Sequence, residues 1–591
     1  MKKKLIMMLF VVTFFTMSAA SASAVVNDTL LVGLRYGSTA LFSANLENAI
    51  GAGYEFGYFD EDRDFIYLGE TDEITISMTA AGTIYMNSSG TYSADEPSGK
   101  SKVMGKWHIQ LEGFEDFDEA QEAAWAYDGY PAYIDGEYVV RIGCFKSKDE
   151  ALEEVESLDF LREEEDLPAD APPADESPED VSAAASYAKR SSVPEYSVVR
   201  SSDTGVIVTV TKTTDILFEF DCSGIYDFGV LPMEERGEDG TSTWFKGFKY
   251  AGGFSYPRVT GGDLHVVNVV DVEDYVKGVI AYEMNSSWPI EALKAQAVCA
   301  RTYACKSVKH LSSYGFDVCN STCCQVYYGH GSGVLYPDAN SDAAVDETAG
   351  ECLYYDGELV QDAVYHSSNG GATENCEYVW GSRREYLIGK EDPYEGEISI
   401  PNYEYSVTYT ASELTNILKQ KGADIGTVKN VYVSEYTPMG NVYKITFEGS
   451  NGSKTYKGDT CRTIFYSSTY NKSVKSLRYD INGGNKKQIF YVNDEGDTLS
   501  TMEDVCVISG SGEVSSLSDG TLHVLTEEGS ATIKSGTTAS SSTGSFTITG
   551  TGSGHNVGMS QYGAKAMAEE GYDYEDILDF YFTGITLERI G

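Results

Sequence analysis

The stretch DVEDYVKGVIAYEMNSSWPIEALKAQAVCARTYACKSVK, residues 271–309, decides how the surrounding chain is expected to fold. Its first half has apolar residues at helical spacing, which predicts a helix that ends at the polar run 285–287. Pro289 suits the first turn of a second helix, because the N–H groups of that turn have no intrahelical partner. The second helix is rich in alanine, whose small side chain lets another element pack closely. We therefore predict two consecutive helices with a polar corner between them.

Glu283 stands at the corner between the two predicted helices, beside Tyr282, Met284 and Trp288. Apolar surroundings disfavour the charged form of a carboxyl group, so we expect a raised pKa for this side chain. A carboxylic acid that keeps its proton near neutral pH is what general acid catalysis requires. A capped pair of helices with a solvated charged face is the alternative interpretation of the same residues.

Three stretches of the chain resemble one protein family. The first is AYEMNSSWPIEALKAQAVCARTYA, inside residues 271–309. The second is YHSSNGGATENCEYVWGSRREYL, residues 365–387, and the third is GTGSGHNVGMSQYGAKAMAEEGYDYEDILDFYFTGITL, residues 550–587. All three are similar to the stage II sporulation protein D family of peptidoglycan lytic transglycosylases, which act in spore engulfment. Three long motifs in the family's order make a specific signal, and the resemblance extends loosely over residues 194–591.

The resemblance implies cleavage of glycan strands by a single carboxylic acid. Glu283 would protonate the glycosidic oxygen between N-acetylmuramic acid and N-acetylglucosamine, and its carboxylate would then accept the proton of the muramoyl 6-hydroxyl. That hydroxyl attacks its own anomeric carbon, so no second carboxylate is needed and a 1,6-anhydro sugar results. Lys294 and Arg301 lie two helical turns apart on one face and would stabilise developing charge or hold N-acetyl and lactyl groups. A solvated helix face is the alternative for these two residues.

The second and third motifs supply most of the predicted substrate-binding residues. Their glycines permit turns in which a sugar approaches the backbone closely, and their aromatic side chains suit stacking on sugar faces. Any single aromatic residue is more often part of a core. Asn556 stands where the family more often has glycine, a departure that asparagine tolerates in a left-handed backbone. The predicted substrate-binding residues are Tyr303, Ser367, Ser368, Glu374, Trp380, Tyr386, His555, Ser560, Gln561 and Tyr562.

The segment KHLSSYGFDVCNSTCCQVYYG, residues 309–329, places His310, Cys319, Cys323 and Cys324 within fifteen residues. One histidine and three cysteines are a ligand set that zinc accepts in closed tetrahedral sites. The segment also resembles a family pattern in which histidine and cysteine residues of this loop bind zinc, with Cys323 where the family has histidine. We predict one structural zinc, which the chemistry itself does not need. A disulfide from Cys319 to Cys323 or Cys324 is the alternative in a secreted chain.

The N-terminus carries the pattern of a secretory signal peptide over residues 1–24. Three lysines precede an apolar run of about 13 residues, and Ala22-Ser23-Ala24 is a small-residue cleavage site. The run is short for a spanning helix of about 20 residues, although an uncleaved membrane anchor is the alternative. We therefore expect export to the extracytoplasmic space or the cell wall.

Acidic residues outnumber basic ones 91 to 43 in this chain of 591 residues, which gives a net charge of −48. Such a charge repels phosphate backbones and excludes nucleic acid as the expected partner. The charge identifies no ligand; the family resemblance implies peptidoglycan glycan strands, in peptide-free form, and other wall hydrolases of engulfment as partners. The eleven cysteines are odd in number, so they cannot all pair within one chain.

The expected fold class is α+β, with several domains. Residues 25–104 alternate in short strand-like runs and predict a small β-rich region. Residues 105–162 repeat a strand-turn-helix plan, EGFEDFDEAQEAA against GCFKSKDEALEEV, which predicts a small β-α-β-β-α module. This order resembles a SPOR domain, which binds glycan strands, and a generic ferredoxin-like domain is the alternative. Residues 163–194 are rich in proline and acidic residues and predict an extended linker, and residues 195–591 are the expected mixed, β-rich catalytic domain with its helical hairpin.

The sequence thus predicts a secreted lytic transglycosylase that acts in wall remodelling during sporulation and carries a glycan-binding module. A non-catalytic wall-binding or amidase-enhancing protein is the main alternative, because relatives with the same motifs modify amidase behaviour. A purely structural surface protein is a third interpretation. Release of anhydro-terminated sugars distinguishes the enzyme from both.

Overall fold

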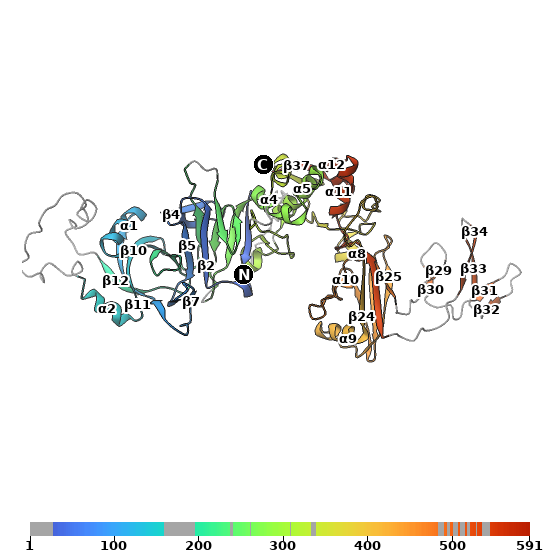
Figure 1. Cartoon of the computed structure of the whole chain (residues 1–591), viewed down its shortest axis with the longest axis horizontal. Coiled ribbons are helices and arrows are strands. Elements are labelled where there is room, and N and C mark those ends of the chain that lie inside the picture. Colours follow the sequence, from blue (N-terminus) through green and yellow to red (C-terminus); the bar gives the residue numbers. More distant parts are fainter. Residues whose placement is uncertain are drawn as a thin grey trace, which may run out of the picture.

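The computed structural model describes residues 28–590 except 159–194, 237–239, 260–261, 308, 333–337 and most of 483–543. The predicted signal peptide and the acidic segment 163–194 lie outside the described residues. The fold is mixed α+β and rich in sheet (Figure 1). Among the described helices, none combines the length and apolar character needed to cross a membrane.

Two large sheets dominate the N-terminal half of the chain. The seven-stranded sheet has the order β20 (Val318–Cys319), β1 (Thr29–Arg35), β19 (Val266–Asp271), β18 (Gly253–Tyr256), β15 (Phe228–Pro232), β3 (Tyr54–Phe59), β4 (Phe65–Thr71). The ten-stranded sheet has the order β12 (Tyr196–Arg200), β9 (Trp107–Phe114), β11 (Glu137–Phe145), β10 (Gly129–Ile134), β14 (Ile216–Asp221), β13 (Val206–Val210), β5 (Thr75–Ala80), β2 (Ser43–Ile50), β16 (Ser242–Phe245), β17 (Phe248–Tyr250). The sheets share a core, in which Phe56 of the first stacks on Phe218 of the second with ring centroids 5.3 Å apart.

Strands from the two ends of the N-terminal half pair with one another. β1 pairs with β19 in antiparallel register, Thr29 opposite Asp271, and β3 pairs with β15. In the other sheet β5 lies between β2 and β13. The structure therefore differs from the separate β-rich region expected over residues 25–104. The sequence identifies these runs as strands, but β1, β3 and β5 each pair with a strand more than a hundred residues away.

Residues 107–155 form, in order, β9, α1 (Phe117–Ala126), β10, β11 and α2 (Lys148–Val155), and β12 pairs with β9 as a further strand of this module. Asp116 and Ser147 cap the two helices by accepting backbone N–H groups. The four strands pair antiparallel in the order β12-β9-β11-β10, and β10 then continues the sheet through a parallel pair with β14. Residues 159–194 consequently join α2 to β12, two elements of the same module, rather than two halves of the protein.

The two helices expected in residues 271–309 are present as α4 (Val272–Glu283) and α5 (Ile290–Lys306). Asp271 caps α4 by accepting the N–H groups of Glu273 and Asp274, and Pro289 precedes the first residue of α5. The alanines of α5 are buried because this helix is surrounded. The elements packed on it are α4, α7 (Ala339–Glu347), β21 (Glu351–Tyr355), α11 (Gln561–Glu570) and α12 (Tyr574–Tyr581).

Among the described residues, the C-terminal half contributes a three-stranded sheet of order β22 (Glu358–Leu359), β21, β37 (Thr586–Arg589), a short ladder that joins distant motifs, and two further three-stranded sheets. One sheet has the order β24 (Glu404–Thr410), β35 (Ser545–Thr551), β28 (Tyr479–Asn482), and the other β25 (Val428–Tyr436), β26 (Val442–Gly449), β27 (Gly452–Lys457). The ladder is a parallel pair of β23 (Tyr365–His366) and β36 (Met559–Ser560).

Smaller elements complete the described chain. The short helices are α6 (Leu311–Tyr314), α8 (Cys376–Trp380), α9 (Ala411–Gln420), α10 (Thr460–Thr463) and the 3-10 turns Gly37–Thr39 and Tyr394–Glu397. The short strands are β6 (Ile84–Asn87), β7 (Tyr92–Ser93), β8 (Ser101–Met104), β22 (Glu358–Leu359) and β37 (Thr586–Arg589). Three two-stranded pairs are β29 (Phe490–Val492) with β30 (Asp497–Leu499), β31 (Cys506–Ile508) with β32 (Val514–Ser516), and β33 (Thr521–Thr526) with β34 (Gly529–Lys534).

Candidate active site

Glu283 is the last residue of α4, and its half-buried carboxyl group receives two hydrogen bonds. The Val326 N–H donates to Oε1 at 3.3 Å, and Gln561 Nε2 donates to Oε2 at 3.5 Å. Burial raises the pKa of Glu283, and the two donors offset part of that rise by stabilising the carboxylate. The raised pKa of Glu283 agrees in direction with the expectation from its apolar neighbours. The group is thus placed to hold a proton and remains partly accessible to solvent.

The three sequence motifs meet at this carboxyl group. β23, from the second motif, pairs with β36 from the third, with Tyr365 opposite Met559 and His366 opposite Ser560. Gln561 follows directly at the start of α11 and also donates to Gln296 Oε1 of α5 at 3.4 Å. The short parallel ladder therefore fixes Gln561 against both helices of the first motif.

A hydrogen-bonded chain of buried polar side chains lies beside Glu283. Tyr275 donates its hydroxyl proton to Gln325 Oε1 at 2.9 Å, and Gln325 Nε2 donates to the Tyr365 hydroxyl at 3.1 Å. Tyr365 lies near enough for the charge of Glu283 to raise its pKa further, after the larger effect of burial. Gln325 follows the last cysteine of the metal-ligand segment, so this chain connects that segment to the acid.

Aromatic side chains flank the corner that carries Glu283. Trp288 lies 4.9 Å from Tyr562, measured between ring centroids, and Tyr282 lies 5.2 Å from Tyr328. The Tyr562 N–H donates to the Ser367 carbonyl oxygen at 3.1 Å, which ties the third motif to the second. Tyr562 and Ser367 are both partly exposed, so these two predicted substrate-binding residues are accessible beside the acid.

Two histidines and a tryptophan form a second group of rings, in which Trp380 is the exposed member and His366 is buried. Trp380 is 44% exposed, and its ring lies 4.9 Å from His555, which in turn lies 5.4 Å from His366. Burial lowers the pKa of His366 well below its usual range and that of His555 to about 3, with the charge of Arg462 as a further cause for His555. His366 Nδ1 faces the Val557 carbonyl at 3.1 Å and so carries the proton of a neutral ring. Both imidazoles are therefore neutral at ordinary pH.

Four predicted substrate-binding residues are instead buried in structural contacts. Ser368 and Ser560 both donate to Glu395, which joins the second and third motifs at the 3-10 turn. Glu374 is 1% exposed and accepts from Thr437 and Asn441, and Tyr386 packs beside Tyr355. These side chains hold the motifs together and are not exposed to a sugar. The residue types fit either role, and only burial decides between them.

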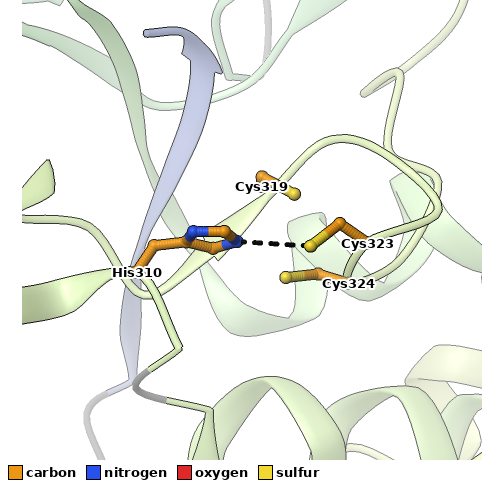
Figure 2. Close-up of side chains that lie close together, drawn as sticks. All are labelled: His310, Cys319, Cys323 and Cys324. Atoms are coloured by element: carbon orange, nitrogen blue, oxygen red, sulfur yellow. Dashed lines mark hydrogen bonds between the residues drawn. The ribbon is translucent and has the colours of Figure 1, made fainter. Parts of the chain in front are cut away.

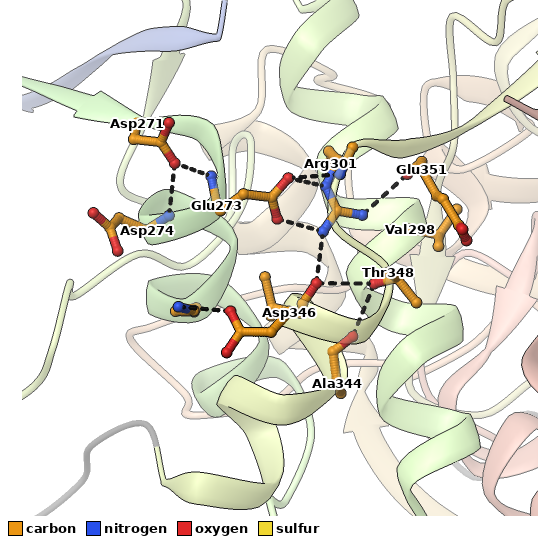
Figure 3. Close-up of polar contacts among 12 residues, drawn as sticks. Asp271, Glu273, Asp274, Val298, Arg301, Ala344, Asp346, Thr348 and Glu351 are labelled. Atoms are coloured by element: carbon orange, nitrogen blue, oxygen red, sulfur yellow. Dashed lines mark hydrogen bonds and ion pairs between the residues drawn. The ribbon is translucent and has the colours of Figure 1, made fainter. Parts of the chain in front are cut away.

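Arg301 and Lys294 share a helix face as expected, but that face is turned to other helices. Figure 3 shows the partners of Arg301. The Arg301 side chain is fully buried, pairs with Glu273 of α4, and donates to the carbonyl oxygens of Glu351 and Val345. Lys294 pairs with Glu291 and Glu347 at 2.9 and 2.7 Å. A fully buried guanidinium with these partners cannot contact a glycan, so the structure gives Arg301 a structural role in place of the predicted catalytic one. Lys294 is likewise occupied by its ion pairs with Glu291 and Glu347 and does not pair with Glu283.

The predicted metal ligands converge (Figure 2). One ligand atom from each of His310, Cys319, Cys323 and Cys324 lies within 4.8 Å of all the others, and Cys323 Sγ is 3.9 Å from His310 Nε2. A hydrogen bond from Cys324 lowers the pKa of Cys319, as metal binding by thiolate requires. This set of one imidazole and three thiols fits zinc. Tyr303, predicted to bind substrate, lies beside Cys324 of this cluster.

The cluster is packed against the N-terminal strand. Cys319 ends β20, whose parallel pairing places it opposite Gly33 of β1. The ring of Phe316 occupies the space where a side chain at Gly33 would lie, and Tyr36 packs on Phe316 with ring centroids 4.9 Å apart. Asp317 pairs with Arg63 and accepts the Leu31 N–H at 2.9 Å. The cysteine-rich segment therefore joins strands at the start of the chain to the helices that carry the acid.

Comparison with known proteins places this geometry in a family. The model of the family described as SpoIID, stage II sporulation protein, matches residues 260–355, which include α4, α5 and the cysteine cluster. An uncharacterised protein of Brachyspira hyodysenteriae is 30% identical over 324 residues, which cover 54% of this chain and 68% of that protein. The chain belongs to the SpoIID family.

Two relatives with descriptive names come from Bacillus subtilis. The amidase enhancer is 31% identical to this SpoIID-family chain over 323 residues, which cover 53% of the chain and 40% of that relative. Stage II sporulation protein D is 27% identical over 334 residues, which cover 55% of the chain and 76% of that protein. The chain thus spans well under half the length of the amidase enhancer.

Several residues of this SpoIID-family site were not predicted from sequence. Gln296 is a fully buried glutamine in the alanine-rich helix, and a polar residue among small apolar ones was its only signal. Gln325 and Glu395 had no recognisable pattern around them. Asn556 has the left-handed backbone expected for it, with φ at 67°, and its side-chain amide donates to the Asn369 carbonyl oxygen.

Proposed function

We propose that this protein is a peptidoglycan lytic transglycosylase in which Glu283 is the catalytic acid. The observation that carries the proposal is a partly accessible carboxyl group with a raised pKa at the point where all three family motifs meet. Family membership adds a sporulation and cell-wall setting. The proposed substrate is the glycan strand, cleaved between N-acetylmuramic acid and N-acetylglucosamine.

The proposed reaction uses Glu283 in both of its protonation states. Burial keeps the proton on the acid before the reaction, and the acid delivers it to the glycosidic oxygen. The carboxylate that results is stabilised by the Val326 N–H and the Gln561 amide, which already point at its two oxygens. It then accepts the proton of the muramoyl 6-hydroxyl as that oxygen closes the 1,6-anhydro ring. Because the nucleophile belongs to the substrate, one carboxyl group is sufficient.

The exposed aromatic groups offer surfaces for the sugars on either side of the acid. Trp288 and Tyr562 lie next to Glu283, whereas Trp380 and His555 lie beyond Tyr365 and His366. Aromatic faces bind sugars by packing against their C–H groups, and the neutral imidazoles add hydrogen-bonding atoms. We assign these four side chains to substrate binding.

A non-catalytic role is the second candidate, favoured by one comparison. A relative that is 31% identical carries the name amidase enhancer. In that case the same surface would bind glycan without cleaving it, and other wall hydrolases would be its partners. The two proposals differ in a single measurable product, the anhydro-terminated sugar.

We assign a structural zinc to His310, Cys319, Cys323 and Cys324. The support is the convergence of four ligand atoms of suitable chemistry in a segment that packs on β1. Because all four would be ligands, no position is open for a water nucleophile. The ion would fold the segment between α5 and Gln325, and the chemistry at Glu283 would proceed without it.

We also propose that the module built from β9 to β12 is SPOR-like and binds glycan strands. Its strand order, β12-β9-β11-β10 with two helices, is that of a ferredoxin-like β-α-β-β-α-β unit, which many unrelated proteins also use. Export through the signal sequence at residues 1–24 would bring both glycan-binding regions to the wall.

The product of the reaction tests the proposed function. Purified full-length protein is incubated with peptide-free glycan strands, and the soluble products are analysed by mass spectrometry. Products that end in 1,6-anhydro-N-acetylmuramic acid support the transglycosylase. Binding of strands without any such product supports the non-catalytic candidate instead.

A further inference from the structure

Two thiols outside the proposed metal site meet where α5 packs on β21. Cys305 lies in the last turn of α5, and Cys352 lies in β21. The helix packs directly on the strand, and the two sulfurs lie close enough for each to shift the pKa of the other. A disulfide requires two side chains that approach one another in this way.

Backbone contacts on both sides of the pair fix the helix against the strand. The Leu353 N–H donates to Thr302 Oγ1 at 2.9 Å, and Arg301 Nη1 donates to the Glu351 carbonyl oxygen at 3.0 Å. Thr302 and Arg301 lie one helical turn before Cys305, and Leu353 and Glu351 flank Cys352 on the strand. The register that brings the two sulfur atoms together is therefore held by hydrogen bonds independent of the sulfurs.

The two cysteines differ in access and in acidity. Cys352 is fully buried, whereas Cys305 is partly exposed at the end of its helix. The contact between the two sulfurs raises the pKa of the Cys305 thiol, and the same contact, with the charge of Arg301, lowers that of Cys352, so the Cys352 thiolate can accept the Cys305 proton as Cys305 attacks. An external disulfide can thus reach Cys305, while Cys352 supplies the thiolate that acts second.

We propose that Cys305 and Cys352 form a disulfide bond when the protein meets a small-molecule disulfide such as oxidised glutathione. In the first exchange Cys305 sulfur attacks the oxidant, forms a mixed disulfide and releases one thiol. In the second, Cys352 sulfur attacks the Cys305 sulfur, and the second thiol leaves. Two cysteine thiols are oxidised and one external disulfide is reduced to two thiols, with the two protons of the cysteines passing to the leaving thiolates.

The bond would enclose residues 306–351, a segment that contains the metal-ligand cluster and Val326, whose N–H donates to Glu283. Closing such a loop removes conformational freedom from the unfolded chain, so the oxidised protein is expected to melt about 5 °C or more above the reduced one. The bond would also tie α5, which carries Gln296, to β21. Neither effect depends on cleavage of glycan.

Peptide mapping of the full-length protein tests the pair. The zinc-loaded protein is incubated with oxidised glutathione, its free thiols are alkylated, and it is digested without reduction for mass spectrometry. The expected result is a cross-linked peptide pair joining Cys305 to Cys352, which disappears on reduction. Alkylation of both cysteines after this treatment, or a link from Cys305 to a cysteine of the metal cluster, overturns the proposal.

Two variants serve as controls. Cys305→Ser should lose the peptide pair and the oxidant-dependent rise in Tm. Cys376→Ala, at a buried cysteine outside both groups, should keep them. A rise in Tm with oxidant that persists in Cys305→Ser would also contradict the proposal. Mapping of the wild-type chain decides the matter even where a variant folds poorly.

Discussion

The guanidinium of Arg301 forms a two-point ion pair with the carboxylate of Glu273, with Nε 2.8 Å from Oε1 and Nη2 2.5 Å from Oε2. Glu273 Oε1 also accepts the Gly350 N–H at 2.9 Å. This pair joins α4 and α5 to the turn before β21, and no water reaches the guanidinium. Arg301, which the sequence motif predicted to assist catalysis, thus stabilises the packing of α4, which carries Glu283, against α5.

Replacing Arg301 by alanine should reduce stability far more than it alters catalysis. The change leaves Glu273 without its cation, and breaking a buried pair in this way costs about 3–5 kcal/mol. Urea denaturation should show that loss in the free energy of unfolding. Lys294→Gln, which removes a cation from more exposed ion pairs, is the control and should cost about 1 kcal/mol or less. If the Arg301→Ala protein has normal stability but a low turnover per folded molecule, Arg301 has a catalytic role and the structural assignment is wrong.

Activity should fall as pH rises through the raised pKa of Glu283. The acid must carry its proton to act, and burial holds that pKa above the usual range of a glutamate. Because the pKa values of His366 and His555 are lowered, these histidines stay neutral and contribute no transition between pH 5 and 8. A pH profile of the initial rate measures this. If the fall in rate at high pH is unchanged in His555→Gln, it is due to Glu283 as proposed. If that fall disappears in His555→Gln, the histidine is responsible and the prediction is wrong.

The raised pKa of Glu283 also makes the stability of the protein depend on pH. The folded protein binds the Glu283 proton more tightly than the unfolded chain, so this contribution to stability is present at low pH and is lost as pH rises through the folded pKa. Glu283→Gln removes the titration. The variant should therefore gain stability relative to wild type as pH rises from about 4, the usual pKa of an unfolded glutamate, through the raised folded pKa, measured by urea denaturation. A difference that stays constant with pH would show that Glu283 titrates alike in both states.

Removal of zinc should loosen the N-terminal strand before it affects the acid. Cys319 lies in β20, which pairs with β1, so loss of the ion should speed hydrogen exchange in residues 29–35. Elemental analysis should find about one zinc per chain, fewer in Cys323→Ser, and an unchanged amount in Cys144→Ala, which lies outside the cluster. Affinity should fall at low pH as the thiolates protonate. Absence of zinc, with two of the three cluster cysteines joined as a disulfide, would contradict the proposed zinc site.

Cutting the chain inside residues 163–194 should not separate its two parts. β12 follows this segment and pairs with β9 before it, and β1 pairs with β19. A specific protease site engineered there should give two polypeptides that elute together under native conditions and separate in urea. By the same reasoning, a fragment of residues 195–591 should fold poorly because its sheets lack β1, β3 and β5. Independent elution of the cut halves, each folded, would restore the linker interpretation.

Local features of the fold were predictable from sequence, and long-range ones were not. The predicted end of the first helix at the polar run 285–287 lies within a few residues of the end of α4 at Glu283, and the start of α5 after Pro289 follows from turn chemistry. The shared face of Lys294 and Arg301 follows from helical period alone. What covers that face depends on α7 and on Glu273, and neither position is encoded in the spacing. The pairing of β1 with β19 joins strands far apart in sequence, and strand patterns carry no information about partners.

Part of the site's membership was predictable from sequence, but the burial of those residues was not. The motifs identify Gln561 and Tyr562 near the acid, and the structure places both beside it. Glu374 and Ser368 have the same residue chemistry as sugar ligands, yet both are buried in hydrogen bonds to other loops. Raised pKa at Glu283 was predictable because its apolar neighbours are adjacent in sequence.

The rate at which Glu283→Gln releases anhydro-terminated sugar tests the central claim most directly. The substitution keeps the shape of the side chain and removes the transferable proton. Glu347→Gln, on an exposed face of α7, is the matched control. We expect wild type and Glu347→Gln to release the product at equal rates, and Glu283→Gln to be about 10²–10⁴-fold slower with the fold retained. Release by Glu283→Gln at the wild-type rate would contradict the account.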